Sequence, residues 1–332
     1  MAATIKDVSA AAGVSVKTVS RVLNKERYVR AETRHRVEAA MAALRFRPNF
    51  AARSLAGRRP FQVALIWDNP SPYYVFAVQE GVRARCDEEG VRMIAQPYGL
   101  ERGAGDGIAS LLDTVAPDGL ILTPPVCDEV AILAELERRG VPTVRVSPGL
   151  NPARSSSVYI DNQAAAHTMT ARLIELGHRR IGFIVGHVKY AASAQRLAGY
   201  RAALNDAGIQ ADPGLIQPGL FDFRSGSAAA EVLLARPSPP SAIFASSDDM
   251  AAGVLATAHA KGLRVPEQLS IAGFDDTDLA SLLWPPLTTI RQPTREMAYV
   301  AADLLFRSEE GPERRQIAFE LIERASTGPP AA

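Results

Sequence analysis

The sequence is poor in cysteine and has no long apolar run. Only two of its 332 residues are cysteine, Cys86 and Cys127, and they stand too far apart for a metal knuckle or a redox pair. We expect both to be reduced, buried thiols. No run approaches the roughly 18 apolar residues of a membrane-spanning helix, so no such helix is expected.

Sequence motifs of enzymes, metal sites and secretion are also missing. The five histidines have no metal-ligand spacing, and neither a G-x-S-x-G nor a G-x-x-x-x-G-K-[ST] motif occurs. Asp248–Asp249 and Asp275–Asp276 are pairs of the residue type that glycoside cleavage uses, but neighbours at strand ends usually cap helices. The N-terminal MAATIKDVSAAAG does not resemble a secretory signal. We therefore expect a cytoplasmic protein that is not an enzyme, with no metal and no cofactor.

The net charge of +1 conceals an uneven distribution. Residues 1–60 hold 13 Lys and Arg against 4 Asp and Glu, a balance of +9, whereas the remaining residues hold 24 against 32, a balance of −8. A basic head on an acidic body is typical of a polyanion-binding module attached to another domain.

The start of this head predicts two short helices joined by a turn. Thr4 and Asp7 have the spacing of a capping box, and Gly13 permits a turn after the first helix. Ser15 can cap a second helix over residues 16–24. Two helices joined in this way form a helix-turn-helix, whose second helix enters the major groove of DNA.

The second predicted helix carries a polar, cationic ridge. Lys17 and Arg21 lie one turn apart on this ridge and can reach base edges, and an arginine–guanine contact contributes roughly 1–3 kcal/mol of discrimination. One recognition helix covers only a half-site, so we expect a homodimer on a palindromic operator in double-stranded DNA, associated with the nucleoid. The candidate DNA-binding residues are Thr4, Ser15, Val16, Lys17, Thr18, Ser20, Arg21, Asn24, Ala52, Arg53 and Leu55.

The helix-turn-helix domain, residues 1–48, is completed by a third amphipathic helix that begins near Glu32 and ends before Pro48. Residues 49–60 predict a hinge helix and linker. A helix this short is marginal alone in water. A helix that folds on DNA and inserts Leu55 into the minor groove accounts for the pattern, since apolar wedges there unstack a base step. A flexible linker between domains is the other interpretation.

The remaining chain, residues 61–332, alternates short apolar runs with helical stretches. Such alternation predicts parallel, doubly wound sheets, and the units are too many for one sheet. We therefore predict a two-lobed α/β body for effector binding and dimerisation, attached to a small all-α helix-turn-helix head. The expected N-lobe comprises about residues 61–160 plus 291–320, and the expected C-lobe about 161–290.

Polar side chains follow the predicted strands, where open α/β sheets bind their ligands. Hydroxyls, carboxylates, an arginine and aromatic faces suit a neutral, polyhydroxylated ligand. Asp275 can accept bonds from two hydroxyls, Arg196 can donate several, and a tyrosine ring can lie under the apolar face of a sugar. The candidate effector-binding residues on these grounds are Asp68, Tyr73, Tyr74, Thr123, Arg145, Ser147, Arg196, Ser247 and Asp275.

Several segments resemble one known family. TIKDVSAAAGVSVKTVSRVLN and TRHRVEAAMAALRFRPNFAARSLAG resemble the head of the LacI/GalR (lactose/galactose repressor) family, and VYIDNQAAAHTMTARLIELGHRRIGFIVG and LSIAGFDDTDLA resemble segments of its body. The resemblance implies a periplasmic-binding-protein-like fold with an effector in the cleft between two lobes. It also implies that Val16, Lys17 and Arg21 read bases, and that Leu55 is the hinge-helix wedge. By position, it adds Phe221 and Trp284 as candidates to line the cleft.

The resemblance implies a repressor of carbohydrate-utilisation genes that a sugar or glycoside inducer releases from its operator. A repressor that depends on a purine-like corepressor is the alternative, and a sugar-binding or glycoside-processing protein is the alternative of another class. A transport binding protein is disfavoured because a basic head precedes the body. The final IERASTGPPAA has no heptad pattern, so we expect no tetramerising coiled coil.

Overall fold

The computed structural model describes residues 3–23, 28–44, 46, 62–99, 106–307 and 311–331. The chain divides into two compact units, Met1–Phe61 and Gln62–Ala332. The predicted hinge segment, residues 49–60, lies outside the described residues.

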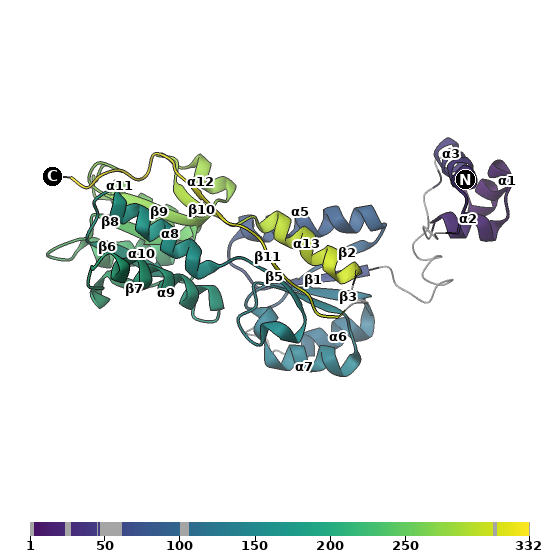
Figure 1. Ribbon diagram of the computed structural model, residues 1–332, viewed down its shortest axis with the longest axis horizontal. Coiled ribbons are helices and arrows are strands. Elements are labelled where there is room, and N and C mark those ends of the chain that lie inside the picture. The colour runs from purple at the N-terminus through teal and green to yellow at the C-terminus, as the bar shows by residue number, and fades with distance from the viewer. Residues whose placement is uncertain are drawn as a thin grey trace. The chain divides into compact units, whose positions relative to one another are not determined.

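The described residues of the first unit form helices α1 (Ile5–Ala12), α2 (Val16–Leu23) and α3 (Ala31–Ala43) (Figure 1). The predicted capping box at the start of α1 is present, because the Thr4 hydroxyl accepts from the Asp7 amide while the Asp7 carboxylate accepts from the Thr4 amide. Gly13 ends α1 with φ of 63°, in the left-handed region that glycine favours. The core of the unit is formed by small apolar side chains on all three helices: Val8, Ala12, Val19, Val22, Val37 and Ala40.

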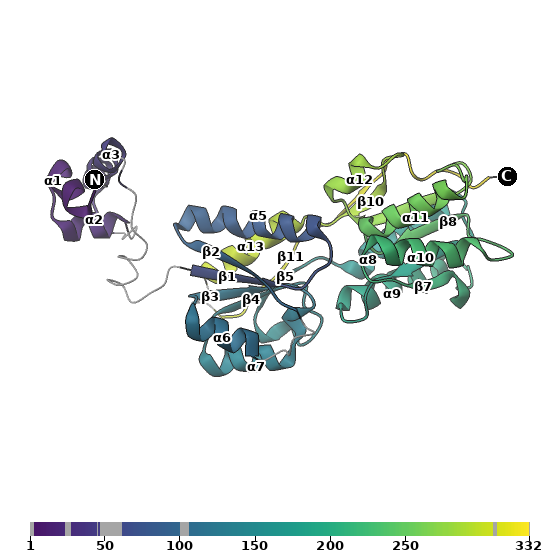
Figure 2. The same ribbon diagram turned by 180° about the vertical axis from the view of Figure 1, so that it is seen from behind.

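The described part of the second unit forms two six-stranded sheets, one in each lobe. In the N-lobe the strand order is β11-β5-β4-β3-β1-β2, with every described pair parallel. Helices α5 and α13 cover one face of this sheet and α6 and α7 the other (Figures 1 and 2). The N-lobe elements are β1 (Gln62–Trp67), α5 (Pro72–Glu89), β2 (Arg92–Pro97), α6 (Asp106–Thr114), β3 (Gly119–Leu122), α7 (Val130–Arg139), β4 (Thr143–Val146), β5 (Ser156–Tyr159), α13 (Thr294–Phe306) and β11 (Arg314–Gln316).

The C-lobe has the strand order β12-β10-β9-β8-β6-β7, and only the pairing of β10 with β12 is antiparallel among its described pairs. Helix α8 packs beside α9, and α10 beside α11. The C-lobe elements are α8 (Asn162–Glu175), β6 (Ile181–Val185), α9 (Ala191–Asp206), β7 (Ile216–Pro218), α10 (Phe223–Leu234), β8 (Ala242–Ala245), α11 (Asp248–Ala260), β9 (Ser270–Asp275), α12 (Asp278–Leu282), β10 (Thr288–Arg291) and β12 (Glu320–Ile322).

The chain passes between the lobes three times. It crosses from β5 to α8, from β10 to α13, and from β11 to β12. Because β12 belongs to the C-lobe sheet, the chain returns to that lobe at Glu320, and Gly328 packs there through a hydrogen bond from its amide to Ser270. Within the described ranges, every helix is too short or too polar to cross a lipid bilayer.

Candidate functional site

The exposed side of α2 is the first candidate site. Val19 and Val22 turn into the core of the first unit, whereas Val16, Lys17 and Arg21 are exposed. The sequence of α2, VKTVSRVL, contains no carboxylate. The helix therefore presents an apolar residue and two cations on a surface without opposing charge of its own.

The hydroxyls at the start of the helices have local capping roles. The Thr18 amide donates to the Ser15 Oγ at 3.1 Å, and the two side-chain oxygens lie 2.9 Å apart. Thr4 is engaged in its capping box with Asp7. Thr4 and Ser15 are exposed, while Thr18 and Ser20 are half-buried. The other predicted DNA contacts, Asn24, Ala52, Arg53 and Leu55, lie outside the described residues.

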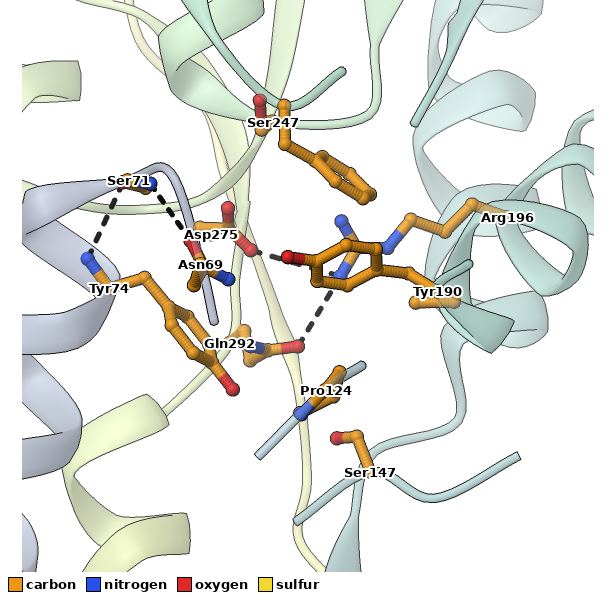
Figure 3. Close-up of a pocket in the computed structure, with 12 residues that line it drawn as sticks. Asn69, Ser71, Tyr74, Pro124, Ser147, Tyr190, Arg196, Ser247, Asp275 and Gln292 are labelled. Carbon is orange, nitrogen blue, oxygen red and sulfur yellow. Dashed lines mark hydrogen bonds and ion pairs between the residues drawn. The ribbon is translucent and has the colours of Figure 1, made fainter. Parts of the chain in front are cut away.

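A cavity of about 50 Å³ at the meeting of the two lobes is the second candidate site (Figure 3). Both lobes and the β10–α13 crossover contribute to it. The lining residues are Asn69, Ser71, Tyr74, Pro124, Ser147, Tyr190, Ala192, Arg196, Phe221, Ser247, Asp275 and Gln292.

Arg196, on α9, supplies the cationic group of this cavity. Its Nε donates to Asn162 Oδ1 at 2.9 Å, and one Nη donates to the carbonyl of Ser246 at 2.5 Å. The other Nη donates to Gln292 Oε1 at 3.4 Å and lies 3.8 Å from Asp275 Oδ1. The guanidinium also lies over the ring of Phe274, 3.4 Å from its centroid. Most of the donors of Arg196 are thus already used by the protein.

Burial opposes the charge on both members of the Arg196–Asp275 pair. Removal from water raises the pKa of Asp275 to about 7, although the nearby guanidinium favours the carboxylate. Burial likewise lowers the pKa of Arg196 to about 10, with Asp275 acting in the opposite direction. Arg196 therefore remains cationic at neutral pH, while Asp275 can either accept hydrogen bonds as a carboxylate or donate one as an acid.

Three of the lining residues hold unusual backbone conformations. Ser147, Phe221 and Asp275 have φ of 48°, 63° and 110°, in the region that side chains other than glycine rarely adopt. Such conformations cost on the order of 1–3 kcal/mol each and cluster at ligand sites. The Oγ of Ser147 is buried without a hydrogen-bond partner among the described residues, so it is available to a ligand in the cavity.

Aromatic rings form the apolar part of the lining. Tyr190 and Phe221 meet edge to face with centroids 5.0 Å apart, and Phe221 packs so closely on Gly186 that no side chain would fit there. Tyr74 enters from α5, in the N-lobe. Figure 3 shows Tyr74 approaching the cavity from one side and Tyr190 and Arg196 from the other, with Asp275 and Gln292 between them.

The neighbouring carboxylates do not form a pair suited to glycoside cleavage. Asp248 is buried and accepts bonds from the Thr277 amide and the Thr289 hydroxyl, at 2.8 and 2.7 Å. Asp276 forms ion pairs with Arg291 and Arg324. Only Asp275 of these residues lines the cavity, and the other carboxylates position the loop that carries it. Among the described residues, no cluster of three or more His, Cys, Asp or Glu is arranged to hold a metal ion.

Six of the eleven predicted effector residues line the cavity, and the other five do not. Tyr74, Ser147, Arg196, Phe221, Ser247 and Asp275 line the cavity. Tyr73 and Asp68 lie near it but face two adjoining grooves. Thr123 is buried and donates at 3.4 Å to the carbonyl of Ile66, at the end of β1.

Two further predicted effector residues do not line the cavity in this structure. Arg145 is fully buried within the N-lobe, where its guanidinium donates to the carbonyls of Leu150 and Asn151, at 2.8 and 2.5 Å, and to Ser155 Oγ. It holds the loop after β4 in place. Trp284 is 82% exposed on the turn after α12 and lies outside the described lining.

Six lining residues were not among the sequence candidates: Asn69, Ser71, Pro124, Tyr190, Ala192 and Gln292. Ser71 was detectable as the N-cap of α5, because it precedes a proline at the first helical position. Tyr190 and Gln292 carried no local signal. They reach the cavity because α9 begins at its edge and the second crossover passes through it.

Comparison with known proteins gives matches to both units. The model for bacterial regulatory proteins of the lacI family matches residues 4–49, and that of a periplasmic binding protein-like domain matches residues 170–327. The HTH-type transcriptional repressor PurR of Escherichia coli is 35% identical over 332 residues, which cover 98% of this chain and 96% of that protein.

Two solved structures are similar over nearly the whole chain. One is a complex of the transcriptional regulator CelR with cellobiose, with 33% identity and a TM-score of 0.74, covering 98% of this chain and 99% of that one. The other is the lac repressor dimer bound to operator and the anti-inducer ONPF, with 28% identity and a TM-score of 0.76, covering 99% of this chain and 100% of that one.

Proposed function

The chain belongs to the lacI family of bacterial regulatory proteins, and we propose that it represses carbohydrate-utilisation genes until a sugar or glycoside releases it from a palindromic operator. It is a DNA-binding transcriptional regulator and not an enzyme. We infer that it acts in the cytoplasm, at the nucleoid, where its operator lies.

The DNA-binding part of the proposal is supported by the exposed face of α2. Arg21 and Lys17 would contact base edges and phosphates, with Val16 contacting a thymine methyl. One such helix covers a half-site, so a homodimer on a two-fold symmetric operator fits the geometry. The similar lac repressor structure is a dimer bound to operator.

The effector part rests on the chemistry of the cavity. Arg196 is the only cationic side chain in the described lining, and Asp275 and Gln292 already take up much of its charge and donor capacity. A phosphate or carboxylate on the effector would meet no free cation there, which favours a neutral ligand. Hydroxyl groups could donate to Asp275 and bond with Ser147, while the Tyr74 or Tyr190 ring packs against the apolar face of a sugar. The similar CelR structure holds the neutral disaccharide cellobiose.

The proposed mechanism couples the cavity to the operator. The effector would change how the two lobes are arranged, and in the dimer this would change the spacing of the two DNA-binding heads. A coupling of roughly 1–3 kcal/mol between the two sites is typical. An inducer would weaken operator binding by this amount.

A ligand screen tests the proposal. Monosaccharides, disaccharides and plant glycosides are tested by thermal shift on the full chain, and operator release by each hit is measured by gel shift. We expect a neutral sugar or glycoside to stabilise the chain and to release DNA, whereas its phosphorylated form should do neither. Stabilisation by phosphorylated sugars alone would contradict the proposed effector class.

A purine-like corepressor is the second candidate. The edge-to-face pair of Tyr190 and Phe221, with Tyr74 opposite, also suits a planar heterocycle. The two candidates differ in sign, because a corepressor would strengthen operator binding. A gel shift in the presence of purine bases therefore distinguishes them.

A further inference from the structure

The loop that carries Asp275 has two consecutive residues in the left-handed region of backbone conformation. Asp275 ends β9 with φ of 110°, and Asp276 follows it with φ of 52°. Residues other than glycine rarely adopt this region, and each one that does so is strained. Neither residue holds this conformation by its own preference, so the surrounding structure has to impose it.

The side chain of Asp276 is held between two arginines. Its Oδ2 accepts from Arg291 Nε at 2.8 Å, and its Oδ1 accepts from an Nη of Arg324 at 2.6 Å. Only 7% of this side chain is exposed, and it does not line the cavity. Because each carboxylate oxygen is bonded to a cation away from bulk water, both bonds are of the stronger, charge-assisted kind.

Each of the two arginines is also fixed to a neighbouring segment of the C-lobe. Arg291 ends β10, in register with the last residue of β9, and donates to Glu320 at the start of β12 at 2.7 Å. Arg324 follows β12 and donates to the Leu287 carbonyl, just before β10, at 2.8 Å. Arg291, Asp276 and Arg324 thus form a clamp that ties the loop after β9 to the adjacent strand and to the C-terminal segment.

We propose that Asp276 is a positioning residue for effector binding. Held by the clamp, it keeps Asp275 in the strained conformation that places the Asp275 carboxyl in the lining of the cavity. Because its own side chain bonds outside the cavity, it contributes to effector affinity through Asp275. The C-terminal segment after β12 supports the site through Arg324, although none of its described residues lines the cavity. The role in effector binding rests on the proposed function, whereas the clamp depends only on contacts within the chain.

The clamp is tested first without any effector, by amide hydrogen exchange in the full chain. The Thr277 amide donates to Asp248 Oδ2 at 2.8 Å, and the Gln292 amide donates to the Asp275 carbonyl at 3.2 Å. Both amides should exchange faster in Arg324→Gln. This variant changes no residue next to them in the sequence, so their intrinsic exchange rates stay the same. Unchanged exchange at both amides would overturn the clamp.

Asp212→Asn is the matched control. Asp212 also stands near two arginines of the C-lobe, 3.7 Å from Arg180 and 3.5 Å from Arg236, but it precedes β7 and does not line the cavity. This variant should leave the exchange of the Thr277 and Gln292 amides unchanged. Equally fast exchange at both amides in the control would overturn the clamp, because the effect would then follow from the loss of any aspartate–arginine cluster.

A double-mutant cycle then tests whether Asp276 acts through Asp275. Calorimetry uses the sugar with the largest thermal shift in the screen above. Asp276→Asn should bind it roughly tenfold more weakly than the unmodified chain, because a strained residue released from its support changes an equilibrium by about this factor. In the Asp275→Asn background the same substitution should change the affinity by about twofold or less, since the group that it positions is gone.

The sign of the change separates positioning from a purely electrostatic effect. Loss of the Asp276 charge by itself would favour the carboxylate form of Asp275 and strengthen sugar binding. Stronger or unchanged binding by Asp276→Asn would therefore overturn the positioning role, as would equal losses in the two backgrounds. If no sugar binds but the Thr277 and Gln292 amides respond as expected, the clamp stands and the carbohydrate assignment is wrong.

Discussion

At the scale of single residues, the cavity combines buried charge with strained backbone. Asp275 has φ of 110°, lies 3.8 Å from the Arg196 guanidinium and is shielded from water. The strained backbone and the burial of a charge both cost stability, so a position with only a structural role would not favour them. Together they leave a carboxyl group that changes its protonation state near neutral pH. We therefore expect the effector affinity of the cavity to depend on pH through Asp275.

Effector affinity should fall as the pH decreases from 8 to 6. Above the raised pKa of about 7, Asp275 is a carboxylate that accepts two hydroxyl bonds, and below it the proton occupies one acceptor. If binding requires the ionised form, affinity falls roughly tenfold over this range. Calorimetry at each pH measures this. Asp275→Asn should bind more weakly and lose the pH dependence, so a variant with the full original dependence would contradict this assignment.

The side chain of Arg21 should set the specificity for one base position. Arg21→Ala is expected to lose roughly 1–3 kcal/mol of discrimination there while keeping its other preferences. Fluorescence anisotropy with a set of single-base operator variants measures this. Arg36→Ala is the matched control, because it removes an exposed cation from α3, outside the recognition helix. Equal loss of affinity for every operator variant by Arg21→Ala would indicate a phosphate contact instead.

At the scale of elements, the first unit depends on precise helix ends. Helices α1 and α2 have eight residues each, a length at which isolated helices are marginal in water. They are held by their caps and by a small valine- and alanine-rich core. The position of the recognition helix therefore depends on the turn that Gly13 allows.

Removing the N-cap of α1 should lower the stability of this helix. Thr4→Ala loses the hydroxyl that accepts from Asp7 and is expected to cost about 1 kcal/mol of helix stability. Amide hydrogen exchange over residues 5–12, measured without DNA, should become faster. Thr4→Ser keeps the hydroxyl and should exchange like the original chain, so faster exchange in both variants would rule out capping as the cause.

Much of the element order was predictable from the sequence, whereas part of the site was not. Apolar spacing does not mark the first turn of α5, which begins at Pro72 because Ser71 caps the helix and a proline suits its first position. Strands such as β5, β10 and β11 have three or four residues and polar side chains, so apolar periodicity does not mark them. Arg145 ends in the lobe interior because backbone carbonyls nearby accept its bonds, which depends on tertiary structure alone.

At the scale of the whole molecule, regulation requires that each site changes the affinity of the other. In the second unit Ser71 bonds to Asp249, and Tyr190 to the Asp68 carbonyl, so the cavity lies where the two lobes contact each other and an effector bound there can change their arrangement. Each subunit of a dimer would transmit that change to one DNA half-site. Thermodynamic linkage then requires that operator binding alters effector affinity by the same factor.

The most direct test of this account measures that factor in both directions. Operator affinity is measured with and without a saturating concentration of the effector found in the sugar screen, and effector affinity with and without saturating operator. We predict that the effector weakens operator binding by roughly five- to 150-fold and that the operator weakens effector binding by the same factor. An operator affinity that no bound small molecule changes would contradict the account.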